Sequence, residues 1–144
     1  MVRVNAFVIC DEVLEGSMRN GDPIHLLASP QVSIRLPRIP ATYSCSIYVG
    51  IVGFDIDGVG RMAVVLLDPA GQPVKRTAPM EISRKTLPPY LEEDLPADQH
   101  ALATICELHK ARIKSEGLYT FVLVYNSQDI ASMPIPIYRQ KKGR

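Results

Sequence analysis

The sequence predicts an all-β fold, a single antiparallel β-sandwich. Short apolar runs rich in β-branched residues alternate with Pro and Gly along the whole chain, a pattern typical of sandwiches and barrels. The chain holds 12 Pro and 9 Gly among 144 residues, of which 47% are hydrophobic. This length is enough for one domain to bury a core without a disulfide or a bound metal.

The N-terminal half begins with a predicted strand over residues 2–10, where β-branched and aromatic residues dominate. A turn-rich loop is expected over residues 15–23, because Asn20-Gly21 favours positive φ. Pro37 and Pro40 enclose a kinked connection, since Pro cannot donate to a ladder. The other strands expected in this half span residues 24–28, 31–36 and 43–54.

A β-hairpin is predicted around Asp68-Pro69-Ala70-Gly71, with strands over 61–68 and 74–76. Pro at the second position and Gly at the fourth suit a type I turn. A short strand over residues 80–83 follows.

The C-terminal part ends in two predicted strands. Residues 117–125 predict a clear strand, in which Tyr119, Phe121, Leu123 and Tyr125 on one face alternate with Leu118, Thr120, Val122 and Val124 on the other. The last strand, 130–138, carries Pro134 and Pro136 two residues apart. Both would present a missing N–H to the same side, which predicts an edge strand.

Residues 98–113 fit two structures. As a helix, the segment would have Asp98 as N-cap and an apolar stripe from Leu102 to Ile113, and the local pattern slightly favours this. As a strand, Leu102, Cys106 and Leu108 would face one way.

Three segments carry a resemblance to a known family: Val4–Asp11, Leu67–Gly71 and Glu116–Phe121. Over nearly the whole chain the sequence resembles a family of small bacterial proteins of unknown function with an immunoglobulin-like or C2-like β-sandwich. The resemblance implies a strand over residues 102–108, although the acidic loop before it leaves a short helix near 98–106 possible. It brings no catalytic residues.

The near-neutral net charge of +1 hides an uneven distribution. Residues 139–144 hold four of the 16 basic residues and no acid, whereas the other 12 basic residues face 15 acidic ones. We therefore expect a β-sandwich domain over 1–138 and a solvated basic tail over 139–144. With no aromatic residue between its cations, the tail does not predict nucleic-acid binding.

Cys10, Cys45 and Cys106 are odd in number and form no metal-like pair. They are expected to be buried, reduced and packed as small hydrophobes. The N-terminal apolar run is too short for a signal peptide, and no window approaches the ~20 apolar residues of a membrane span. These features predict a cytoplasmic protein without membrane contact.

Two acidic loops are the candidates for metal binding. Asp55 and Asp57 resemble the start of a calcium loop, and a C2-like site would draw further oxygens from Glu92, Glu93 and Asp94. The residues after Asp57 depart from the EF-hand pattern, so plain polar loops are the favoured interpretation. No cofactor is expected.

The Pro-rich loop 87–96 supplies the candidate partner contacts, which are Leu87, Tyr90, Leu91 and Leu95. It could serve as a docking peptide or fold back over the core. No GxSxG, Walker or GxGxxG motif is present, so an enzyme is not expected. The sequence thus favours a non-enzymatic interaction or assembly module of a bacterial cytoplasmic system, with homodimerisation through a sheet edge possible. A calcium- or carbohydrate-binding sandwich is the alternative.

Overall fold

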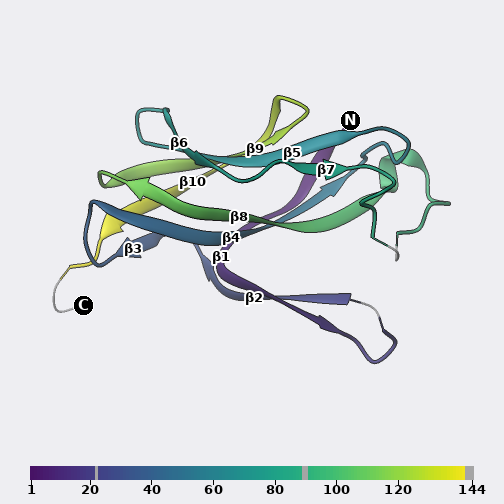
Figure 1. The fold of residues 1–144 in the computed structure, drawn as a ribbon, viewed down its shortest axis with the longest axis horizontal. Helices are drawn as coiled ribbons and strands as arrows, with labels where there is room; N and C mark the ends of the chain where they lie inside the picture. The colour runs from purple at the N-terminus through teal and green to yellow at the C-terminus, as the bar shows by residue number, and fades with distance from the viewer. Residues whose placement is uncertain (22, 89–90, 142–144) are drawn as a thin grey trace.

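The computed structural model describes residues 1–21, 23–88 and 91–141, and in these ranges the chain forms a sandwich of two β-sheets (Figure 1). The all-β prediction is confirmed. The elements are β1 (Arg3–Ser17), β2 (Pro23–Gln31), β3 (Ile34–Leu36), β4 (Ala41–Val52), β5 (Gly60–Leu67), β6 (Pro73–Arg76), β7 (Met80–Ile82), the short 3₁₀ helix η1 (Ala97–Gln99), β8 (Ala101–Ile113), β9 (Gly117–Tyr125) and β10 (Gln128–Arg139).

The first sheet has the strand order β2-β1-β4-β8 and is antiparallel throughout. Its inner face is built by alternate residues of β4. Cys45, Ile47, Val49 and Ile51 are all buried, as the alternating pattern of the sequence predicts.

The second sheet has the order β3-β10-β9-β5-β6, and β7 also pairs with β5. The predicted hairpin is present between β5 and β6. In its turn the Gly71 N–H donates to the Asp68 carbonyl over 2.9 Å, and the Asp68 carboxylate accepts from the Ala70 and Gln72 N–H groups. The strand β3 runs parallel to β10, whereas the other pairs are antiparallel.

The core lies between the two sheets. Both inner faces contribute to it, and β9 supplies its largest aromatic side chains through Tyr119 and Phe121. The largest fully buried side chains are Tyr119, Phe54, Phe121, Ile9, Ile47, Ile51, Met62, Leu66, Leu108, Ile113, Leu123 and Ile135.

The ambiguous segment after residue 98 is a strand. β8 pairs with β4 over its whole length, and Leu102, Cys106 and Leu108 point into the core. The helical prediction fails because a 3.6-residue stripe could not present these side chains to the sheet. The possible short helix near 98–106 is reduced to η1, which ends before that strand begins.

Two other boundaries differ from the predictions. β1 continues to Ser17, so most of the expected loop 15–23 belongs to a long β1–β2 hairpin. Of the predicted strand 31–36, Gln31 ends β2 and only Ile34–Leu36 form β3. The Asn20-Gly21 turn is confirmed, since Gly21 has a φ of 90° and its N–H donates to the Met18 carbonyl.

The predicted edge position of the last strand is correct for only part of its length. β10 pairs with β9 from Gln128 to Ile137, and β3 covers its other side only at Ile137–Arg139. Pro134 and Pro136 lie before that covered end. The Gln140 N–H then donates to the Leu36 carbonyl over 2.8 Å, which holds the start of the basic tail against β3.

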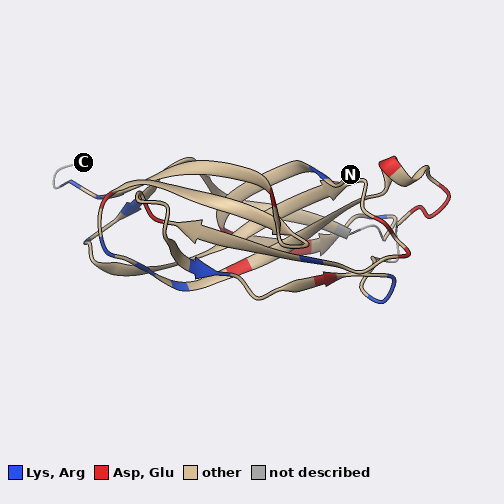
Figure 2. Cartoon of the chain, turned by 90° about the horizontal axis from the view of Figure 1, so that it is seen from above, with Lys and Arg blue, Asp and Glu red and all other residues tan. Residues whose placement is uncertain are grey.

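Many of the charged residues lie in segments near the two ends of the sandwich (Figure 2). Figure 2 shows acidic segments in the loop at the end opposite the C-terminus, and basic segments near the C-terminus. The described part of the chain contains no helix with the length and hydropathy of a membrane span.

Candidate functional site

The side chain of Arg84 bridges the two acidic loops predicted from the sequence. Arg84 donates to Asp57 Oδ1 over 2.7 Å and to Glu93 Oε1 over 2.8 Å. This arrangement raises the pKa of Arg84, chiefly through the hydrogen bond to Asp57. Within the Asp55–Gly58 loop, Asp55 Oδ1 accepts from the Asp57 N–H. Two of the five acids predicted as calcium ligands therefore neutralise an arginine.

The remaining acids do not complete a metal-binding group. Among the described residues, no three His, Cys, Asp or Glu side chains are placed to hold one ion. Glu92 and Asp94 are exposed, and Asp55 makes the local loop contact just described. The geometry favours the polar-loop interpretation of these residues.

A depression of about 440 Å³ lies beside these loops, where His100 is 4% exposed. Its Nε2 lies 3.3 Å from the Glu93 carbonyl, and its ring centroid is 6.3 Å from that of Phe54. His100 Nδ1 has no hydrogen-bond partner among the described residues. The imidazole contacts the loop through the Glu93 carbonyl, whereas the carboxylate of Asp57 binds Arg84.

The predicted contact residues of the Pro-rich loop are only partly available. Leu87 and Leu91 are half-buried and pack against the core, while Leu95 is 41% exposed. Tyr90 lies outside the described residues. The burial of Leu87 and Leu91 agrees with the interpretation in which this loop folds back over the core.

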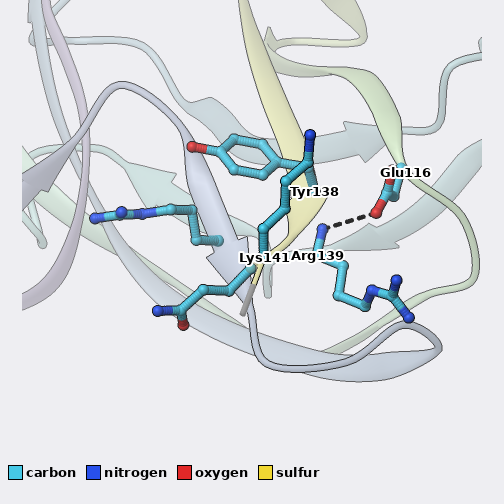
Figure 3. A pocket seen from close by; sticks show the side chains of 6 residues that line it. Glu116, Tyr138, Arg139 and Lys141 are labelled. Carbon is cyan, nitrogen blue, oxygen red and sulfur yellow. Dashed lines mark hydrogen bonds between the residues drawn. The ribbon is translucent and has the colours of Figure 1, made fainter. Parts of the chain in front are cut away.

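A basic depression of about 610 Å³ lies at the end of β10 (Figure 3). Arg35, Arg139 and Lys141 surround Tyr138, and the Glu116 carboxylate accepts from the Arg139 N–H over 3.0 Å. All three cations are exposed, so salt and water screen their attraction for an anion. Sequence reasoning treated Arg139 and Lys141 as tail residues and did not place Arg35 beside them.

The three thiols are poor candidates for nucleophiles. All are free and buried, and the Cys10 thiol donates to the Ser46 carbonyl over 3.4 Å. Burial raises the pKa of Cys45 to about 12 and that of Cys106 to about 11, and it also raises the pKa of Cys10. A thiol with a raised pKa carries little of the reactive thiolate.

The most unusual surface belongs to the β1–β2 hairpin, which lies apart from the two layers in Figure 1. β1 pairs with β4 only as far as Cys10, so both strands beyond it pair with each other alone. Five large apolar residues on the two strands beyond Cys10 belong neither to the core nor to the half-buried shell around it: Val13, Leu14, Ile24, Leu26 and Leu27.

The ladder of this hairpin sorts its side chains onto two faces. Leu14 and Leu26 lie directly opposite each other and are 46% and 55% exposed. Val13 and Leu27, also opposite each other, are on the other face and are half-buried. The hairpin thus presents a paired-leucine face to solvent.

The sequence predicts the strand 24–28 and the Asn20-Gly21 turn of this hairpin, but it predicts that the first strand ends at residue 10, although a signal for its continuation is present. β-forming residues flank the Asn20-Gly21 turn at matched distances, with Val13-Leu14 before it and Leu26-Leu27 after it. Asp11, Glu12 and Glu15 interrupt the first strand and made it resemble a loop.

No protein-family model and no curated protein matches the chain. Solved structures that align with it include β-glucosidase from Listeria innocua in complex with isofagomine and in complex with glucose. The TM-score is 0.48 for both, at 16% and 15% identity over 92% of this chain. A mutant of that enzyme with laminaribiose gives 0.47, at 15% identity over 94%. The chain spans 16% of the length of each of these chains, and such a likeness says nothing about activity.

Proposed function

We propose that the protein is a non-enzymatic interaction module that contacts a protein partner through the β1–β2 hairpin. The observation that carries the proposal is the position of Leu14 and Leu26. They lie opposite each other on the exposed face of the hairpin, in the part that no longer pairs with β4. Full burial of a leucine side chain contributes about 1.5–3 kcal/mol. Covering this face would therefore favour association.

The hairpin itself would gain order from such contact. An isolated two-stranded hairpin is only marginally stable in water, and this one extends past the strand that supports it. The exposed leucines of this hairpin are suited to binding, because a partner supplies the third strand or the second layer that the hairpin lacks.

The Pro-rich loop is the weaker contact candidate in this proposal. Leu95 is the exposed leucine there among the described residues, whereas Leu87 and Leu91 already pack on the core. The proposal places the module in a bacterial cytoplasm, where three free thiols stay reduced.

Site-specific photo-crosslinking in the native cells tests the function. A photoreactive residue at Leu26 should give a discrete protein adduct. The same residue at Leu118 is the control, because Leu118 is 57% exposed but lies on β9 of the other sheet. The proposal would be contradicted by equal yields of adduct at Leu26 and Leu118, or by the absence of adducts at both positions.

A further inference from the structure

The two edges of the first sheet differ in how well they are protected against pairing. At one edge, β8 carries exposed Glu107, Lys110 and Arg112, and its ladder with β4 is interrupted by an irregularity opposite Tyr43 and Cys45. Charged residues and bulges of this kind discourage a further strand from pairing. The C-terminal half of the edge formed by β8 is therefore protected against a partner strand.

The edges of the second sheet are protected by the shortness of β3 and β6 and, where β3 leaves β10 uncovered, by Asp129, Pro134 and Pro136. β3 has three residues and includes Arg35, and β6 has four residues and includes Lys75 and Arg76. Short, charged edge strands give a partner few hydrogen bonds to gain.

β2 lacks the charged residues that protect these edges. It is nine residues long, contains no Asp, Glu, Lys or Arg, and lies at the end of its sheet in the described strand order. A long, uncharged and apolar edge strand is a template for pairing with another chain. This edge belongs to the same hairpin that exposes Leu14 and Leu26.

The backbone limits the part of β2 that can pair regularly. Pro23 begins the strand and lacks an N–H, while Ser29 has a φ of 54° and Pro30 follows it. The uninterrupted segment is Ile24–Ala28, and its central residue is Leu26.

We propose that β2 pairs antiparallel with β2 of a second copy, about a two-fold axis that passes Leu26. The proposal rests on the contact function assigned to the hairpin. Leu26 would lie opposite Leu26 of the other copy, and Ile24 opposite Ala28. Since directly opposite residues share a face, both Leu14–Leu26 faces would join into one apolar cluster. At the axis the two hairpins would join into a four-stranded sheet with the order β1-β2-β2-β1.

Charge favours a second copy as the occupant. Among the described residues, the acids nearest to β2 in its sheet are on β1: Asp11, Glu12 and Glu15. Asp22, which precedes β2 in the sequence, lies outside the described residues. Across the joined edge the two β1 strands would be separated by three strand spacings, roughly 14 Å, which exceeds the Debye length at physiological salt. Neutral strands thus meet at the axis, with no repulsion from their acidic neighbours.

Sedimentation velocity of the purified chain is the first test, and it should give twice the 15.9 kDa of one chain. Leu26→Lys places a charge on the axis and should give monomers, whereas the matched control Leu118→Lys should stay dimeric. Circular dichroism and melting of both variants verify that they fold. A Leu26→Lys variant that remains dimeric would place the interface elsewhere and overturn the proposal.

Covalent trapping tests the register. Opposite residues of an antiparallel pair have Cα atoms about 4.5–5.5 Å apart, within the range that a disulfide spans. Mild oxidation should therefore convert Leu26→Cys, but not Leu118→Cys, into a covalent dimer that reduction separates. Equal trapping of both variants would reflect random collision and would overturn the register.

The same measurements separate the failure of this inference from failure of the proposed function. A chain that stays monomeric at about 0.1 mM, where micromolar affinity would give dimers, overturns the pairing of two copies. If Leu26 then still forms an adduct with another protein in cells, the contact function stands with a different partner. If it forms none, both proposals fail.

Discussion

The imidazole ring of His25 lies edge-on to the phenol ring of Tyr48, with centroids 5.5 Å apart and ring planes at 68°. His25 is on β2 and Tyr48 is on β4, two strands that do not pair with each other. The contact joins the face of the hairpin opposite the exposed leucines to the sheet. The pair therefore helps to hold the hairpin against the sheet.

Replacing Tyr48 should loosen the hairpin without unfolding the domain. An aromatic pair of this geometry contributes about 0.5–1.5 kcal/mol. In Tyr48→Ala we expect faster amide hydrogen exchange over residues 12–17 and 24–28, with unchanged exchange in β9. Tyr138→Ala, at a more exposed tyrosine of β10, is the control and should leave the hairpin unchanged. Unchanged exchange in Tyr48→Ala would show that the ladder alone holds the hairpin.

Gly60 should not tolerate a side chain, because the phenol of Tyr125 lies against its Cα. A methyl group there would overlap the Tyr125 ring. Gly60→Ala should cost about 1–3 kcal/mol of unfolding free energy, measured by urea denaturation. Gly16→Ala is the control, since a methyl group there meets only ordinary contacts with Ile24. Equal stabilities of the two variants would mean that the ring moves aside freely.

A charge at Leu123 should prevent folding. The side chain is fully buried on β9, and an ionised carboxylate without a partner costs several kcal/mol or more there. Leu123→Asp should lose its cooperative melting transition in circular dichroism, whereas Leu118→Asp on the exposed face of the same strand should keep it. A cooperatively folded Leu123→Asp would refute the packing of β9.

The success of the sequence prediction at β9 and its failure at the hairpin have one physical cause. β9 is a run of aromatic, β-branched and other apolar residues, with aromatic residues and Leu123 at every second position, so the sequence itself marks the strand. The hairpin buries neither face fully, and its apolar residues therefore follow no period that marks a strand. The sequence of β8 fits both the helical and the strand period. Its strand conformation is decided by pairing with β4, which lies far away in the sequence.

The candidate sites are formed by contacts between segments that are distant in the sequence, so they were harder to predict than the strands. Asp57 and Glu93 were recognised as acids in separate loops, but the Arg84 that joins them belongs to a third segment. Arg35 comes beside Tyr138 only because β3 runs parallel to the last residues of β10. Local patterns carry no information on such pairings.

Removing Arg84 should free the two acidic loops while leaving the sandwich stable. Its side chain and both carboxylates are more than half exposed, and exposed ion pairs contribute little to folding. Arg84→Gln should keep the melting midpoint of the native chain, with faster amide exchange at residues 55–58 and 91–95. Lys85→Gln, next along the chain, is the control. A large drop in the midpoint would give the bridge a structural role that its exposure does not suggest.

Alkaline pH should destabilise the fold through its buried thiols. The pKa of a thiol is 9.0 without burial, and in the folded chain it rises to about 12 for Cys45 and about 11 for Cys106. Because the folded-state pKa is the higher one, the stabilising effect is complete below pH 9. It is lost as pH rises toward the folded values, since the unfolded chain releases its protons first.

Urea denaturation at a series of pH values measures this loss. At about pH 10 each of the two thiols should lower the unfolding free energy by roughly 1 kcal/mol relative to neutral pH. A variant with both Cys45→Ala and Cys106→Ala should be less stable at neutral pH, because it loses buried atoms, but its stability should fall less steeply above pH 9. If the slopes of the two proteins coincide, the thiols do not control alkaline unfolding, and other groups must ionise in their place.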